Sequence, residues 1–134
     1  MIRRMTSKRL SDGSAFEREA GYSRAVRHEN MIAVSATAAL GPDGALHLGD
    51  AYAQTKDAIS RAVAAAERLG ATPETVLRTR LLLAPGCDWI EAVRAHREAF
   101  ADYPPANTTY FVGGFVPDGV LVEVEVDAVA PSPM

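Results

Sequence analysis

The feature that most constrains this chain is its last long apolar run, residues 120–129, in which apolar residues alternate with acidic ones. A strand sends alternate side chains to opposite faces, so this run has a valine face and an acidic face. The acidic residues are Glu123, Glu125 and Asp127. Neighbouring carboxylates on one strand face lie about 7 Å apart and repel each other. The sequence therefore predicts a core strand whose acidic face meets cations, solvent or a ligand.

A second predicted strand, residues 76–84, places Arg78 and Arg80 two residues apart on one face. Their spacing matches that of the carboxylates, and opposite charges on neighbouring strands stabilise each other. We expect one of these arginines to pair with an acidic residue of the 120–129 strand.

The other elements predict an α+β fold. Helices are predicted at 51–69, where Asp50 can cap the first turn and Gly70 ends the helix, and at 88–100, which Asp88 begins. Further strands are predicted at 21–26, 31–35, 45–48 and 107–112. This order indicates a mixed sheet with both helices on one face. The face opposite the helices is partly apolar, which predicts a subunit interface.

Composition narrows the function. A length of 134 residues indicates one domain, 1–134, in which residues 1–12 are expected to be a flexible basic arm. The net charge of −3 argues against binding to nucleic acid. A single cysteine, Cys87, and the lack of a long apolar run predict a cytoplasmic protein without a membrane partner. The three histidines lack the spacing of metal ligands, so no metal is expected.

Several segments, in this order, carry a resemblance to a known family. They are Gly21 to Val26, Val34-Ser35, Ala53-Gln54-Thr55, Pro105-Ala106 and Pro117 to Glu125. The chain resembles the Rid family, the reactive intermediate deaminases that are also called YjgF-like proteins. The resemblance implies a chorismate-mutase-like subunit and a homotrimer with small-molecule clefts between subunits. Active members hydrolyse imines or enamines without a cofactor.

The resemblance also implies site residues. Tyr22 and Glu123 correspond to the family's catalytic tyrosine and glutamate, with Glu125 as the alternative register for the latter. The implied substrate-binding positions are Ser35, Ala36, Asn107 and Thr109. Asn107 stands where active deaminases carry the arginine that binds a substrate carboxylate, and an amide cannot supply its charge-assisted bidentate pair. The chain therefore resembles a divergent branch of the family.

Each candidate has a structural alternative. Arg24 lies on the same predicted strand face as Tyr22, so it either replaces the missing guanidinium or is a solvated surface residue. Glu123 either orients a water molecule at a C=N carbon or only pairs with an arginine of the neighbouring strand. The functions that follow are a deaminase-like hydrolase, a non-catalytic metabolite binder or regulator, and, least favoured by the acidic charge, an endoribonuclease.

Overall fold

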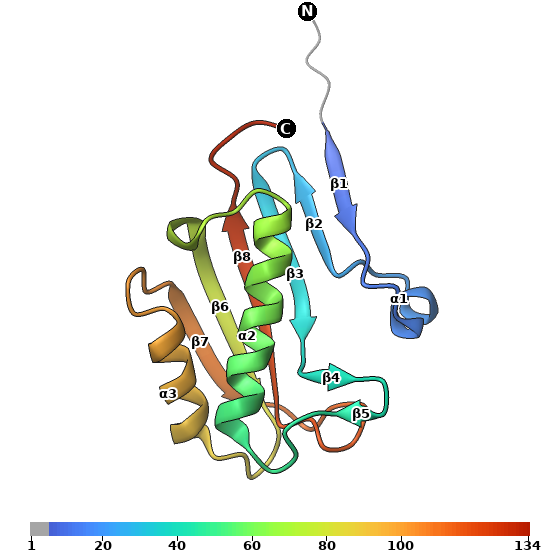
Figure 1. The fold of residues 1–134 in the computed structure, drawn as a ribbon, viewed down its shortest axis with the longest axis vertical. Helices are drawn as coiled ribbons and strands as arrows, with labels where there is room; N and C mark the ends of the chain where they lie inside the picture. The colour runs from blue at the N-terminus through green and yellow to red at the C-terminus, as the bar shows by residue number, and fades with distance from the viewer. Residues whose placement is uncertain (1–5) are drawn as a thin grey trace, which may run out of the picture.

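The computed structural model describes residues 6–134, and its centre is a six-stranded sheet in the order β1-β2-β3-β8-β6-β7 (Figure 1). Its strands are β1 (Ser7–Leu10), β2 (Ala25–His28), β3 (Met31–Thr37), β6 (Val76–Leu83), β7 (Ala106–Phe111) and β8 (Val122–Val129). The helices are α1 (Ala15–Ala20), α2 (Ala51–Arg68) and α3 (Trp89–Ala99), with a 3-10 turn, η1 (Pro73–Thr75). A small hairpin joins β4 (Leu40–Gly41) to β5 (Gly44–Ala45).

Helices α2 and α3 both lie on one face of this sheet (Figure 1). Strand β8 runs antiparallel to both β3 and β6, whereas β6 and β7 are parallel and are connected through α3. The predicted α+β fold, with a mixed sheet and these two helices on one face, is confirmed. Within residues 6–134, no helix combines the length and the apolar character that crossing a bilayer requires.

The core forms where the valine face of β8 meets α2. Val122, Val124 and Val126 are each 0% exposed. The facing side of α2 contains Ala58 and Ala62, which are also fully buried. Because alanine carries only a methyl group, the helix can approach the sheet closely. The alternation of β8 therefore assigns its acidic residues to the other face.

The acidic face is paired only in part. Arg80 Nη1 lies 3.2 Å from Asp127 Oδ2, which confirms the predicted pairing of an arginine with this row. Glu125 lies directly opposite Arg80 in the β6–β8 register, but Glu123 lies opposite Leu82. The row thus ends in a carboxylate whose cross-strand neighbour is apolar.

Arg27 ties three parts of the chain together. It is only 6% exposed, and its guanidinium donates to the carbonyls of Glu29, Leu69 and Ser132 at 2.7, 2.9 and 2.6 Å. Gly70 follows the end of α2 at a φ of +110°, and a Cβ there would lie 2.7 Å from Arg27 Nη1. A glycine is needed at this position for both its backbone conformation and its small size.

The N-terminal region differs from the prediction of a flexible arm over residues 1–12. Residues 7–10 form β1, which pairs antiparallel with β2, while residues 1–5 lie outside the described residues. The free edge of β2 offers unpaired backbone groups, and pairing with them outweighs the repulsion between Lys8 and Arg9.

The predicted strand 21–26 is also shorter than expected. Gly21 ends α1 at a φ of +74°, and β2 begins only at Ala25. Helix α1 was not predicted, although Ser14 followed by Glu17 is a recognised start signal, and Ser14 Oγ does accept from Glu17 N at 3.3 Å. Of the predicted strand 45–48, only Ala45 lies in a strand, at the end of β5, and His47 has a φ of +51°, which a strand does not allow.

Candidate functional site

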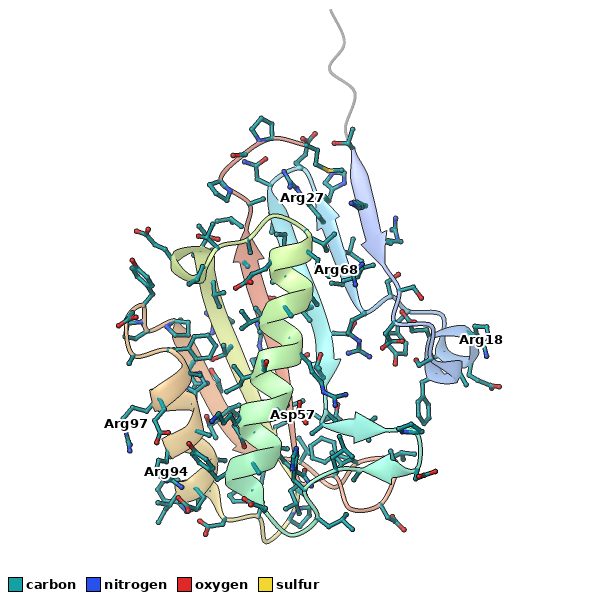
Figure 2. All side chains as sticks on the ribbon, in the orientation of Figure 1. Arg18, Arg27, Asp57, Arg68, Arg94 and Arg97 are labelled. Carbon is teal, nitrogen blue, oxygen red and sulfur yellow. The ribbon has the colours of Figure 1, made fainter. Side chains whose placement is uncertain are left out.

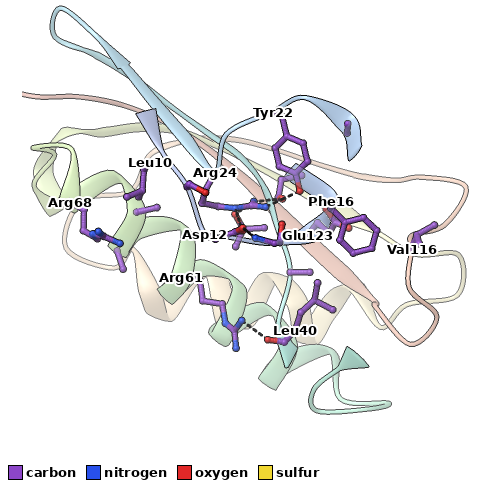
Figure 3. A pocket seen from close by; sticks show the side chains of 18 residues that line it. Leu10, Asp12, Phe16, Tyr22, Arg24, Leu40, Arg61, Arg68, Val116 and Glu123 are labelled. Atoms are coloured by element: carbon purple, nitrogen blue, oxygen red, sulfur yellow. Dashed lines mark hydrogen bonds and ion pairs between the residues drawn. The ribbon is translucent and has the colours of Figure 1, made fainter. Parts of the chain in front are cut away.

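A cleft of about 700 Å³ opens beside the end of β3. Strand β2 pairs with β3 only as far as Val34, and a register shift lies between Val34 and Thr37. On the side of β2, the edge of β3 after Val34 therefore has no neighbouring strand, while its other edge still pairs with β8 at Thr37. The chain between β1 and β2, the end of β3 and one side of α2 line the cleft, together with Val116 and Glu123 (Figure 3).

One buried carboxylate shapes the wall between β1 and β2. Glu17 is 7% exposed, and its Oε2 accepts from Ser11 Oγ, Asp12 N and Gly13 N at 2.9, 3.0 and 2.9 Å. Its Oε1 accepts from Arg24 N at 3.0 Å. These four bonds fold the segment around Glu17 and fix the backbone of Arg24. Sequence reasoning missed Glu17.

Arg24 is the most heavily bonded side chain in the cleft. Its Nε donates to Asp12 Oδ2 at 3.0 Å, and its Nη1 donates to Ala36 O at 2.7 Å and to Thr37 Oγ1 at 3.0 Å. Its Nη2 donates to the Tyr22 hydroxyl at 3.3 Å. Arg24 therefore fixes the end of β3 and orients Tyr22, and its charge is balanced by Asp12.

The charge state of Asp12 supports this pairing. Burial raises its pKa, but hydrogen bonds that involve Glu17, Ser14 and Arg24 outweigh burial and lower the pKa to about 2. Asp12 is thus ionised at neutral pH, so the Arg24 guanidinium already has a full counter-charge.

Glu123 is different, because its carboxylate accepts no hydrogen bond and forms no ion pair with any of residues 6–134. Burial raises the pKa of Glu123, the nearby charge of Arg24 opposes this rise, and the charge of Glu125 adds to it. A carboxyl group with a raised pKa and free oxygens is suited to accept a proton and to return it. Of the two glutamates in question, Glu123 lines the cleft and Glu125 does not.

Four of the proposed site residues meet in this cleft: Tyr22, Arg24, Ala36 and Glu123 (Figure 3). Ser35 lies beside it, where its Oγ donates to the carbonyl of Ser23 at 2.7 Å. Ser35 thereby holds the segment that carries Tyr22 against β3.

Asn107 and Thr109 lie elsewhere in the chain, on the edge strand β7. Asn107 Nδ2 donates to Thr79 Oγ1 at 3.0 Å, and Thr109 Oγ1 donates to Asn107 Oδ1 at 2.8 Å. Thr79 Oγ1 also lies 2.7 Å from His96 Nε2 of α3. Burial lowers the pKa of His96, so this histidine is neutral at neutral pH. Within one chain, Asn107 belongs to this network and not to the cleft around Glu123.

The sequence also did not reveal the α2 side of the cleft. Arg61, Ala64, Ala65 and Arg68 line it there. They lie on one side of the helix because residues three, four and seven apart share a face. The cleft is also lined by Phe16 and Val116, which are 48% and 75% exposed.

Comparison with known proteins identifies the family and the fold of the chain. The sequence model of the family described as Endoribonuclease L-PSP matches residues 13–130. An uncharacterized protein of Streptomyces coelicolor is 40% identical over 121 residues, which is 90% of each chain. The crystal structure of Rv2704 from Mycobacterium tuberculosis, a member of the YjgF/YER057c/UK114 family, is similar with a TM-score of 0.82 and 35% identity, covering 93% of this chain and 100% of that one.

A yeast structure, YEO7, has a TM-score of 0.79 at 22% identity over 93% of this chain and 99% of its own, and shows the shared fold. The matched residues include the segment around Glu17, the bulged end of β3 and the acidic strand β8. The chain therefore belongs to the endoribonuclease L-PSP family, the family of the YjgF proteins.

Proposed function

We propose that the cleft binds a small imine, enamine or related carbonyl-nitrogen compound and hydrolyses it without a cofactor. The observation that carries this proposal is Glu123, a half-buried carboxyl group that faces the cleft without a partner among residues 6–134 and has a raised pKa. Groups with this combination of burial, perturbed pKa and access are characteristic of general acids and bases.

The reaction needs one water and no external reductant or oxidant. The Glu123 carboxylate accepts a proton from water as the water oxygen attacks the C=N carbon, and it returns that proton to the nitrogen to give a carbinolamine. Glu123 then takes the hydroxyl proton of the carbinolamine as the C=O bond forms and passes it to the nitrogen as the C–N bond breaks, so that both water protons end on ammonia. The products are a carbonyl compound and ammonia. Tyr22 supports the substrate, because its oxygen accepts from Arg24 and its own proton remains available for a hydrogen bond.

The test compares Glu123→Gln with Glu125→Gln. The two residues lie on the same face of β8, but only Glu123 lines the cleft. Ammonia release is measured from an imine that a flavin-dependent amine oxidase generates in place, relative to the uncatalysed rate. We expect Glu123→Gln to lower kcat by roughly 100-fold or more, while Glu125→Gln retains the activity. Equal rates for both variants and the unmodified protein would refute the role of Glu123.

Substrates with a carboxylate next to the C=N carbon are expected to turn over poorly. Asn107 has no charge, and its amide is already bonded to Thr79. A lost charge-assisted hydrogen bond is worth about 1.5–3 kcal/mol, or roughly 10- to 150-fold in kcat/KM. The amine oxidase supplies imines without a carboxylate, and an amino-acid oxidase supplies imines with one, so the two types of substrate can be compared directly.

A non-catalytic metabolite binder is the second candidate, and the uncharged Asn107 favours it. It predicts saturable binding of a carbonyl compound without any acceleration of ammonia release. The endoribonuclease activity in the family's name finds less support, since none of the described residues that line the cleft is histidine or lysine and the chain has a net charge of −3.

A homotrimer is part of the same proposal. None of the described residues, 6–134, forms a layer over the sheet face opposite α2 and α3, and on the edge strand β7 Tyr110 and Phe111 are 43% and 52% exposed. Assembly would bring β7 of one subunit, with Asn107 and Thr109, toward another subunit. Light scattering at micromolar concentration is expected to give three times the chain mass, and a monomer mass would contradict this assembly.

A further inference from the structure

Three arginines line the cleft, and their partners differ. Arg24 is paired with Asp12 and donates to backbone and hydroxyl oxygens through the rest of its guanidinium. Arg61 Nε lies 2.8 Å from Asp57 Oδ1, and its Nη1 donates to Leu40 O at 2.6 Å. Both charges are therefore compensated by a carboxylate of the same chain.

Arg68 has no such compensation. Its guanidinium forms no hydrogen bond or ion pair with any of residues 6–134. It projects from α2 toward the side of the molecule that holds β1 and β2, whereas Arg97 projects from the outer side of α3 (Figure 2). Arg68 is thus the cleft cation that remains available to a ligand.

The helix surface next to Arg68 leaves room for that ligand. Arg61 and Arg68 are seven residues apart, which corresponds to two helical turns or about 10 Å along α2. Ala64 and Ala65 lie between them and line the same cleft. Since alanine ends at Cβ, a short aliphatic chain can lie on this surface with a charged end at Arg68.

Arg68 is well separated from Glu123. Arg24 and Asp12 stand between the two in the close view of the cleft (Figure 3). A ligand whose reacting carbon is at Glu123 cannot therefore place a directly attached carboxylate on Arg68. The anionic group must be several bonds away from that carbon.

We propose that Arg68 binds the anionic group of the ligand, and that the ligand is an organic anion whose carbonyl or imine carbon lies several bonds from its carboxylate. This inference rests on the proposed function, because it uses the same cleft and the same reacting position at Glu123. Arg68 acts as a specificity residue and takes no part in proton transfer.

The test uses three stable ketones of equal chain length: 5-oxohexanoate, 2-oxohexanoate and uncharged 2-hexanone. Their dissociation constants are measured by NMR titration of the unmodified protein, of Arg68→Gln and of Arg97→Gln. Arg97 is the control, since it is also an exposed helix arginine and lies away from the cleft. Thermal melting of each variant establishes that it is folded.

We expect the unmodified protein to bind 5-oxohexanoate more tightly than its 2-oxo isomer. Arg68→Gln should raise the dissociation constant of 5-oxohexanoate about tenfold, because one charge-assisted hydrogen bond is lost. The dissociation constant of 2-hexanone should not change. Arg97→Gln should not change the dissociation constant of either ligand.

Two results would overturn the inference while leaving the proposed function intact: equal affinity of the unmodified protein and Arg68→Gln for 5-oxohexanoate, or tighter binding of the 2-oxo isomer. Failure of all three ketones to bind the unmodified protein would overturn the proposed function as well.

Discussion

Gln54 provides the sharpest test of how the fold holds Glu123 in place. This α2 side chain is 1% exposed, and its Nε2 donates to Gly119 O at 2.8 Å while its Oε1 accepts from Leu121 N at 2.8 Å. Both partners belong to the loop that leads into β8, and Leu121 is two residues from Glu123. Gln54 therefore fixes the start of the strand that carries the proposed general base.

Replacing Gln54 by alanine removes these bonds and leaves polar backbone groups without partners. Each lost bond of this kind costs about 1–2 kcal/mol, so Gln54→Ala should destabilise the protein by about 2–4 kcal/mol. For a domain of this size that corresponds to a decrease in Tm of roughly 6–16 °C. Lys56→Ala, at an exposed position of the same helix, is the matched control and should change Tm by little.

Differential scanning calorimetry measures both variants, and ammonia release from an imine measures their activity. Gln54→Ala should also lower kcat below the melting transition, because Glu123 loses its fixed position. Melting temperatures of Gln54→Ala and Lys56→Ala that agree within about 2 °C would show that the two bonds do not hold the loop.

Three further predictions concern stability. Burial raises the pKa of Glu123 above its ordinary value of 4.5, so the stability that its protonated form contributes is present below that value and is lost as pH rises through the folded-state pKa. Chemical denaturation should therefore show Glu123→Gln gaining stability relative to the unmodified protein as pH rises from 4.5 through the folded-state pKa of Glu123. A difference in unfolding free energy that does not change with pH would argue against a buried carboxyl. Arg80→Ala should lower the free energy of unfolding by only about 0.2–1 kcal/mol, since the ion pair of Arg80 with Asp127 is partly exposed. This difference should become smaller in about 1 M salt, which screens the two charges. Gly70→Ala should lower the free energy of unfolding by about 1–3 kcal/mol or more, because the φ of this residue is +110° and a Cβ there would lie 2.7 Å from Arg27 Nη1. An unchanged melting temperature would contradict that contact.

The elements with strong periodicity could be predicted from the sequence. The alternation of β8 and β6 and the long alanine-rich pattern of α2 define one face each, and Asp50 caps α2 as expected, accepting from Ala53 N at 3.0 Å. Helix α3 was predicted at the right place. Trp89 is 52% exposed, whereas Ala92 and Ala95 are buried. Close packing against α2 selects the alanine side over the larger apolar residues.

The site was predictable only where the chain resembles a known family. That resemblance identified Tyr22 and Glu123, which meet in the cleft. Glu17 could not be recognised because its partners are three backbone amides and the Ser11 hydroxyl, and the conformation that brings them together depends on Glu17 itself. Arg68 could not be recognised either, because a single arginine on a helix has no motif and its importance depends on which other charges are compensated.

The two edges of the main sheet differ in their capacity to recruit further strands. Strand β1 is four residues long and carries Lys8 and Arg9, both exposed, whereas Ala106–Phe111 of β7 contains no charged residue. Lysine and arginine on an edge strand disfavour the approach of another chain, and two such edges would repel each other. Growth of a continuous sheet from chain to chain requires two receptive edges on each copy. With one edge blocked by charge, β7 can join a finite assembly, but it cannot propagate a fibril.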